Sequence, residues 1–274
     1  MTWWRPALAA VVCILAGILV AWLMTTGPKR PASSAGDSAS APTSSAPKAD
    51  PPPPGPDIIV LDDFDRAATR GLGRARVGGK WTIFGEKSER PDYAVKDSRG
   101  IFDLSRPALR RTGYLADVSE RSTDVRATFD LDRLPARGPI FVTVIGRRID
   151  DRRSYATDLH LPDRGKVRIS LTAQRNSTSG VTISDRITVP GAIRARQPIY
   201  VRMRTFGVSP TQLQAKAWWG DGPEPTRWTV VERDRDRALQ RSGAVGFSTY
   251  LSRAASNAPI RVSLQDITAR AVPN

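Results

Sequence analysis

The chain has 274 residues, with 42 Lys and Arg against 27 Asp and Glu, a net charge of +15, one Cys and one His. A single cysteine excludes a disulfide framework within the chain, and His160 is the only histidine that a catalytic triad could use. Residues 1–57 hold four of the basic and three of the acidic groups, so a net charge of +14 falls on residues 58–274.

The first predicted element is a membrane-spanning helix over residues 7–24. No residue between Arg5 and Lys29 is charged, and as a helix residues 7–24 would span roughly 27 Å, close to the hydrocarbon thickness of a bilayer. The competing interpretation is a cleaved signal peptide, although such peptides have shorter apolar regions. We therefore predict an N-terminal anchor at residues 1–28 of a single-pass cell-membrane protein whose C-terminal domain is extracytoplasmic. Secretion after cleavage is the alternative.

The next segment, residues 29–57, is built mainly from Pro, Ser and Ala, and it includes four consecutive prolines at 51–54. It has too few large apolar side chains to offset the entropy lost on ordering, so we predict a disordered linker. Its prolines favour extended polyproline II, which suits a spacer between a membrane and a domain.

Residues 58–274 show an apolar period of two, which is typical of strands with one buried face. Val125, Ala127 and Phe129, for example, alternate with polar residues. Expected strands lie at residues 58–63, 80–84, 124–131, 139–146, 155–161, 166–172, 181–189, 199–206, 212–219, 227–232, 244–251 and 260–269. Residues 235–240 are expected to form one helical turn. The pattern predicts an all-β domain, a two-sheet antiparallel β-sandwich.

Several short motifs carry a resemblance to a known family. They include L-D-D-F-D-R (61–66), D-V-R-A-T-F (124–129), E-P-T-R-W (224–228) and V-G-F-S-T-Y-L-S (245–252). With these motifs the domain resembles the concanavalin A-like lectin/glucanase jelly-roll module of actinobacterial cell-surface proteins. The resemblance implies a jelly-roll sandwich. That sandwich hosts lectins, glycosidases and adhesion modules, so the fold alone does not settle the function.

Catalytic patterns are incomplete. Glucanases on this sandwich use a Glu-x-Asp-x-x-Glu strand, because two carboxylates must flank the sugar bond. Glu232-Arg233-Asp234 begins this pattern, but Arg237 stands where the last Glu is needed. His160 is expected on a solvent-facing strand position. The sequence therefore predicts that the chain is not an enzyme, and the alternative is a divergent glycoside hydrolase.

Carboxylates cluster near the first and last expected strands. The candidate metal ligands are Asp62, Asp63, Asp65 and Asp266. In jelly rolls that the domain resembles, these two strands often run together and can hold a structural Ca²⁺, which prefers carboxylate oxygens. The alternative is that these aspartates cap turns or pair with Arg66 and Arg270.

Aromatic residues supply a candidate ligand site. Neighbouring residues of a strand face opposite sides, so the alternation predicts that Trp219 is in the core and Trp218 is exposed. An exposed indole can stack on the apolar face of a sugar ring. Trp228 and Glu224 follow in the chain and complete the candidate ligand-binding set. The alternative is that the loop at Pro223–Pro225 covers the tryptophan.

Together these features predict a membrane-anchored extracellular module, lectin-like or adhesive and without catalytic activity. Its partners would be a cell-envelope polysaccharide or an anionic wall polymer, with the membrane bound through residues 7–24. No nucleic-acid motif is present, so no nucleic acid is expected as a partner. A further alternative is a polyanion binder without sugar selectivity, whose binding would be lost in salt.

Overall fold

Antiparallel strands make up almost all of the regular structure in the computed structural model, which describes residues 57–84, 92–164 and 166–273. The predicted anchor at 1–28 and nearly all of the predicted linker at 29–57 lie outside these residues. Across the described ranges, no helix has the length and apolar character needed to cross a membrane.

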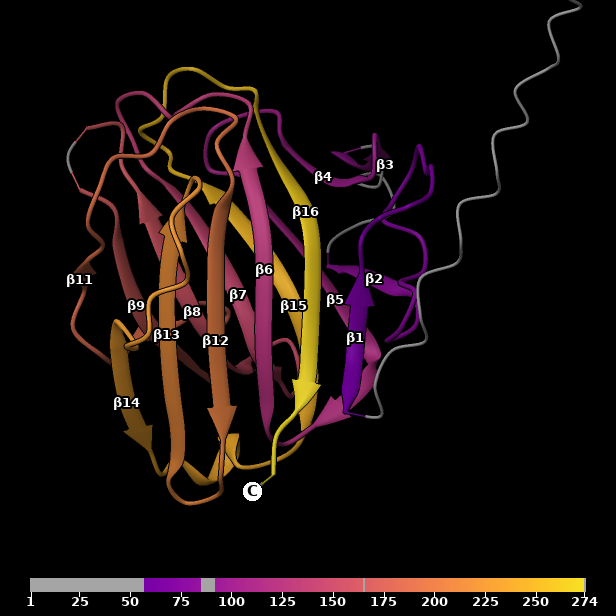
Figure 1. Ribbon diagram of the computed structural model, residues 1–274, viewed down its shortest axis with the longest axis vertical. Coiled ribbons are helices and arrows are strands. Elements are labelled where there is room, and N and C mark those ends of the chain that lie inside the picture. The colour runs from indigo at the N-terminus through magenta and orange to yellow at the C-terminus, as the bar shows by residue number, and fades with distance from the viewer. Residues whose placement is uncertain (1–56, 85–91, 165, 274) are drawn as a thin grey trace, which may run out of the picture. The chain divides into compact units, whose positions relative to one another are not determined.

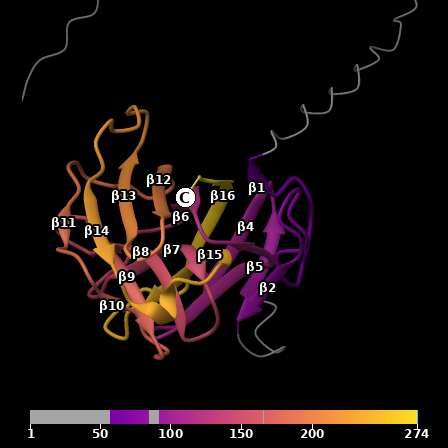
Figure 2. The ribbon, with the colours of Figure 1, turned by 90° about the horizontal axis from the view of Figure 1, so that it is seen from below.

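The strands form two sheets packed face to face (Figure 1; Figure 2). The first sheet has the order β14 (Val230–Asp234), β13 (Thr211–Trp219), β12 (Ile199–Phe206), β6 (Thr123–Leu131), β16 (Ile260–Ala271), β4 (Arg99–Leu104) and β3 (Tyr93–Lys96), with β1 (Ile58–Asp62) also paired to β16. The second sheet has the order β10 (Val181–Thr182), β9 (Arg168–Arg175), β8 (Arg153–Leu161), β7 (Ile140–Arg148), β15 (Gly243–Leu251), β5 (Arg110–Glu120) and β2 (Trp81–Phe84), with β11 (Ile187–Thr188) also paired to β9. The predicted all-β sandwich of two antiparallel sheets is confirmed.

The core lies between the sheets, where each strand places alternate side chains. In β6, Val125, Ala127 and Phe129 are fully buried, as the alternation predicted. Rings join the two layers: Phe247 of β15 lies 5.2 Å from Phe102 of β4 and 5.6 Å from Phe129, measured between ring centroids. The opposite side chains of every strand therefore form two outer faces, one on each sheet.

Most predicted strands are present, with differences at particular places. The strand predicted at 199–206 has the observed bounds of β12, and the predicted helical turn is the short 3₁₀ helix η2 (Arg237–Leu239). The strand predicted at 181–189 is interrupted and forms only β10 and β11. Strands β3, β4 and β5 were not predicted at all.

A buried carboxylate connects β1 to the second sheet. Asp62 is fully buried and accepts hydrogen bonds from Arg66 Nη1 at 2.6 Å and Nη2 at 2.8 Å, from Trp81 Nε1 at 2.6 Å and from the Phe64 amide at 3.0 Å. Phe64 has a φ of 55°, in the left-handed region that non-glycine residues seldom adopt. The Asp62 carboxylate therefore holds a strained turn and links the two layers at their first strands.

Replacing Asp62 with Ala is expected to lower the free energy of unfolding by about 3 kcal/mol, because the buried Trp81 N–H and the Arg66 guanidinium lose their common acceptor. Urea denaturation of both proteins measures the difference. The control is Asp65→Ala, three residues further along the chain, where the side chain is exposed, and it should change stability by less than about 0.5 kcal/mol. Equal effects of the two substitutions would contradict this account.

Candidate functional site

Polar side chains cross the outer face of the first sheet in three rows set by strand register. The first row is Trp218, Tyr200, Thr128 and Asp266; the second is Lys216, Arg202, Arg126 and Thr268; the third is Gln214, Arg204, Asp124 and Arg270. Cross-strand neighbours of this kind lie about 5 Å apart at their Cβ atoms, so each row behaves as one connected set of contacts.

The structure corrects the prediction that Trp218 is an exposed platform. Trp218 does face away from the core, and Trp219 packs against it, as the alternation predicted. However, Trp218 is only 7% exposed. Its ring stacks on that of Tyr200 with centroids 5.2 Å apart and an interplanar angle of 14°, and the Arg126 guanidinium lies over both rings. Its neighbours on the sheet therefore cover the indole.

Glu224 and Trp228 lie beside Trp218, but they too are engaged by neighbours. Glu224 Oε1 is 2.7 Å from Arg202 Nη1 and 2.7 Å from Lys216 Nζ, and both cations also lie over the Trp228 ring. Burial by itself would raise the pKa of Glu224, but the hydrogen bonds from Lys216 and Arg202 outweigh it and leave the pKa lowered. The predicted ligand-binding residues are thus brought together as a closed network of charges and rings.

The four predicted metal ligands do not form one group. Both oxygens of Asp62 are occupied by Arg66 and Trp81, whereas Asp63 and Asp65 are exposed. Asp266 lies on β16, where burial raises its pKa and the charge of Asp63 raises it further. Within the ranges that the structure describes, no three His, Cys, Asp or Glu side chains are placed to hold a metal ion. Asp62 instead pairs with Arg66, which was the alternative to a metal site.

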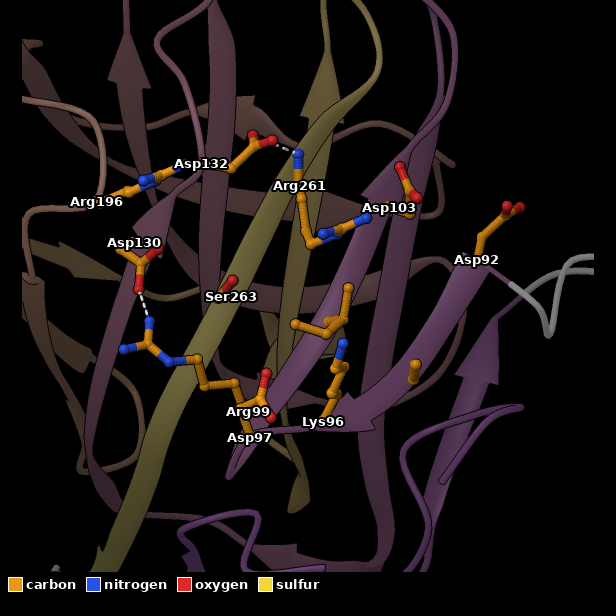
Figure 3. A pocket seen from close by; sticks show the side chains of 12 residues that line it. Asp92, Lys96, Asp97, Arg99, Asp103, Asp130, Asp132, Arg196, Arg261 and Ser263 are labelled. Carbon is orange, nitrogen blue, oxygen red and sulfur yellow. Dashed lines mark hydrogen bonds and ion pairs between the residues drawn. The ribbon is translucent and has the colours of Figure 1, made fainter. Parts of the chain in front are cut away.

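A cleft of about 560 Å³ opens on the same face, at the end where β3, β4, β16 and β6 lie together (Figure 3). Ala94, Ile101 and Ser263 contribute to its lining. The other nine lining residues are charged: Asp92, Lys96, Asp97, Arg99, Asp103, Asp130, Asp132, Arg196 and Arg261. Five carboxylates against four cations leave the cleft almost neutral, in a domain that is strongly basic.

Ion pairs and hydrogen bonds fix part of this lining. Arg99 Nη1 pairs with Asp130, which is only 3% exposed and also accepts a hydrogen bond from Gln265 Nε2 at 2.8 Å. Asp132 Oδ1 accepts the Arg261 backbone N–H at 2.9 Å (Figure 3). These bonds hold two carboxylates in place along the end of β6.

Other polar groups of the cleft are available to a ligand. In the part of the chain that the structure describes, the side chains of Lys96 and Arg196 make no hydrogen bond or ion pair. Asp103 Oδ1 is buried and has no hydrogen-bond partner there. Burial raises the pKa of Asp103, and the charges of Asp92 and Asp132 add to the rise, against the opposing charge of Arg261.

The sequence pattern does not predict this cleft, because it predicts neither β3 nor β4. One signal could have found it. The tripeptide Phe-Asp-Leu occurs twice, at residues 102–104 of β4 and 129–131 of β6. In both copies the Phe and Leu are fully buried and the Asp points to the outer face. Because β16 lies between these strands, the repeat places Asp103 and Asp130 on either side of it.

No protein-family model matches the chain, and no curated protein sequence does so either. Solved structures do match. A structure of the endo-acting O-glycanases that human gut bacteria express to initiate mucin breakdown is 10% identical, covers 79% of this chain and all of that one, and has a TM-score of 0.54. The carbohydrate recognition domain of Emp47p (10% identical, 80% and 100% covered) and the alginate lyase Aly36B (10% identical, 79% and 98% covered) each have a TM-score of 0.49. The fold is thus a β-sandwich that this chain shares with the O-glycanase structure.

The O-glycanase match corrects the prediction that the chain is not an enzyme. The failed Glu-x-Asp-x-x-Glu pattern removed one glucanase arrangement, but the matched structure with a TM-score of 0.54 belongs to enzymes, the O-glycanases. The absence of one sequence motif therefore does not separate this chain from enzymes with the same fold.

The raised pKa of Asp103 has a consequence for stability. In the folded state the carboxyl holds its proton to a higher pH than in the unfolded chain, so its contribution to stability falls as pH rises above about 3.8. We expect Asp103→Asn to melt at a higher temperature than the unsubstituted protein at pH 7, and the difference to vanish below about pH 3.8. Thermal melts from pH 3 to 8 measure it. Asp97→Asn, at a solvent-exposed position of the same cleft, is the control, and a gain of the same size there would contradict the assignment.

Proposed function

We propose that the domain binds a polysaccharide of the cell envelope and that the cleft between β3 and β6 holds one segment of it. The observation that carries the proposal is the charged lining of that cleft, in which Lys96, Arg196 and one oxygen of Asp103 have no partner among the described residues. Vicinal hydroxyl groups of a sugar both donate and accept, so carboxylates and guanidinium groups side by side suit them. The β-sandwich, which the O-glycanase structure shares, supports carbohydrate binding at the level of fold.

The polymer held in this cleft is proposed to be neutral. The carboxylates and cations of the lining nearly cancel, so a polyanion would gain little there and would meet the buried Asp130. A neutral glycan would exchange hydrogen bonds with water for hydrogen bonds with fixed charged groups, and these contacts are little affected by salt.

Replacing Arg196 with Ala is expected to weaken binding of a neutral envelope glycan by about tenfold. The reason is that the variant loses one charge-assisted hydrogen bond in a site from which water is partly excluded. The experiment measures binding of the full-length protein to a panel of neutral and anionic polysaccharides at 50 mM and 1 M salt. The melting temperature should not change, because the Arg196 side chain has no partner among the described residues.

The matched control is Arg133→Ala. Arg133 is near the cleft but outside its lining, and it pairs with Asp132 at the surface. Binding of the R133A protein should stay within twofold of the original. If R196A and R133A bind equally well, the cleft is not the glycan site, and if no neutral glycan binds in 1 M salt, the proposed function fails.

Hydrolysis of the bound glycan is a second candidate, and Asp103 is the observation that favours it. A glycosidase needs one carboxyl group that stays protonated as an acid and another that is ionised. Asp103 combines a raised pKa with a position inside the cleft, close enough to Asp92 and Asp132 for their charges to act on it.

This candidate predicts that the full-length protein releases reducing ends from the glycan it binds, and that Asp103→Asn lowers the rate by at least about a hundredfold while binding persists. Reducing-end release is measured beside binding for both proteins. Binding without release, or release that is equal in D103N, would leave the binding function and remove the hydrolytic one.

The cellular place of this activity is also a proposal. An uncharged run at residues 7–24 and a Pro/Ser/Ala-rich segment at 29–57 precede the domain. We propose that they anchor it to the cell membrane and hold it on the extracytoplasmic side, where envelope polysaccharides lie.

A further inference from the structure

The outer face of the second sheet carries two rows of functional side chains that the cleft does not use. Strand register from β5 through β15, β7 and β8 to β9 places them side by side. The ring row is Arg110, Tyr250, Phe141, His160 and Arg168. The hydroxyl row is Thr112, Ser248, Thr143, Asp158 and Ser170. Each row therefore crosses five adjacent strands and lies one pleat from the other.

The ring row is a continuous aromatic strip. The Phe141 ring centroid is 5.0 Å from that of His160 and 6.2 Å from that of Tyr250, and the Arg110 guanidinium lies 5.1 Å from the Tyr250 ring centroid. All three rings are half-exposed, in contrast to Trp218 on the other sheet. Half-exposed rings in a line can stack on consecutive sugar units of an extended chain.

The hydroxyl row lies beside the rings, where Ser248 and Ser170 are buried and the polar groups bond to one another. Thr143 Oγ1 donates to Asp158 Oδ1 at 2.6 Å, and the Thr112 and Ser248 hydroxyl groups are 2.6 Å apart. His160 Nδ1 is buried and has no hydrogen-bond partner among the described residues. Burial, and then the charges of Arg168 and Arg186, lower the pKa of His160, so its ring is neutral at pH 7 and can accept as well as donate.

The arginines distinguish this face from the first one. On the first sheet, Arg126, Arg202 and Arg204 pair with Asp124 or Glu224. Three arginines of the second sheet behave differently: Arg110 and Arg168 at the two ends of the ring row, and Arg186 at the neighbouring edge. No carboxylate of the described residues forms an ion pair with any of them.

The charges of Arg110 and Arg186 act on Asp158, but the Asp158 carboxylate is already hydrogen-bonded to Thr143. The unneutralised positive charge of this part of the domain thus lies around an aromatic strip, where it attracts anionic groups.

We infer that the outer face of the second sheet is a second binding site, for a carboxylated polysaccharide. Tyr250, Phe141 and His160 stack on successive sugar rings, and Arg110, Arg168 and Arg186 bind the sugar carboxylates along both borders of the strip. A guanidinium group matches a carboxylate with two parallel hydrogen bonds, which favours this ligand over a neutral polymer. The inference names a different face and a different ligand charge from the proposed cleft site, so the two can fail separately.

The experiment measures binding of the full-length protein to polygalacturonate and hyaluronan, with fully methyl-esterified polygalacturonate as the uncharged counterpart. We expect both anionic polymers to bind at 50 mM salt and the ester to bind at least about tenfold more weakly. The triple variant R110Q/R168Q/R186Q should lose at least about tenfold in affinity, with its melting temperature unchanged because these three side chains are exposed. F141A should lose about fivefold.

Arg204→Gln on the first sheet is the matched control for charge, since it removes a cation that Asp124 already neutralises. It should leave polygalacturonate binding within twofold, as should R196A in the cleft. The inference is overturned if neither anionic polymer binds, if the methyl ester binds equally well, or if R196A abolishes binding while the triple variant does not. That last result would show that the anionic polymer binds in the cleft, and that the ligand of the cleft is not neutral as proposed.

Discussion

A buried cation fixes the relative positions of several segments of the sandwich. Arg147 on β7 is fully buried; its Nη1 donates to Thr211 Oγ1 and to the Leu239 carbonyl oxygen, each at 3.1 Å, and its Nη2 donates to the Arg121 carbonyl oxygen. Burial lowers its pKa to about 10, so it remains charged at pH 7. A charged group that is removed from water is stable only while such hydrogen bonds persist. The relative positions of β7, β13, η2 and the turn before β6 are therefore fixed. β6 then runs from this fixed end to the cleft.

The two outer faces differ although the two inner faces are alike. Both inner faces consist mainly of aliphatic and aromatic side chains, because each must pack against the other. Outside, the first sheet pairs its arginines with Asp124 and Glu224, whereas the second leaves arginines beside half-exposed rings. The same basic composition therefore produces one face governed by hydrogen bonding and another governed by net charge. One sandwich can in this way present two chemically distinct surfaces.

More of the fold than of the candidate site could be predicted from the sequence. Regular alternation identified β6, β12 and β13, since nothing in them interrupts the period of two. It failed for β4 and β5, because Gly100 and Gly113 occupy inward or crowded positions and the charged Arg111 is buried, so apolar spacing is lost. The cleft depends on β4 and was missed with it. Trp218 was placed on the correct side of its strand, but no strand-level pattern reports that Tyr200 and Arg126 on neighbouring strands cover it.

Strand β1 pairs antiparallel with the end of β16, from Ile58 opposite Arg270 to Asp62 opposite Ile267, whereas the cleft lies at the beginning of β16, at Arg261 and Ser263. At about 3.3 Å per strand residue, a chain entering at residue 57 therefore meets the domain roughly 30 Å from the cleft. If a polymer binds in the cleft and the segment before residue 57 is anchored, as proposed, tension between them would act parallel to the strands. The hydrogen bonds between β1 and β16 would then be loaded together in shear instead of being peeled one at a time, which makes this pairing a mechanical clamp.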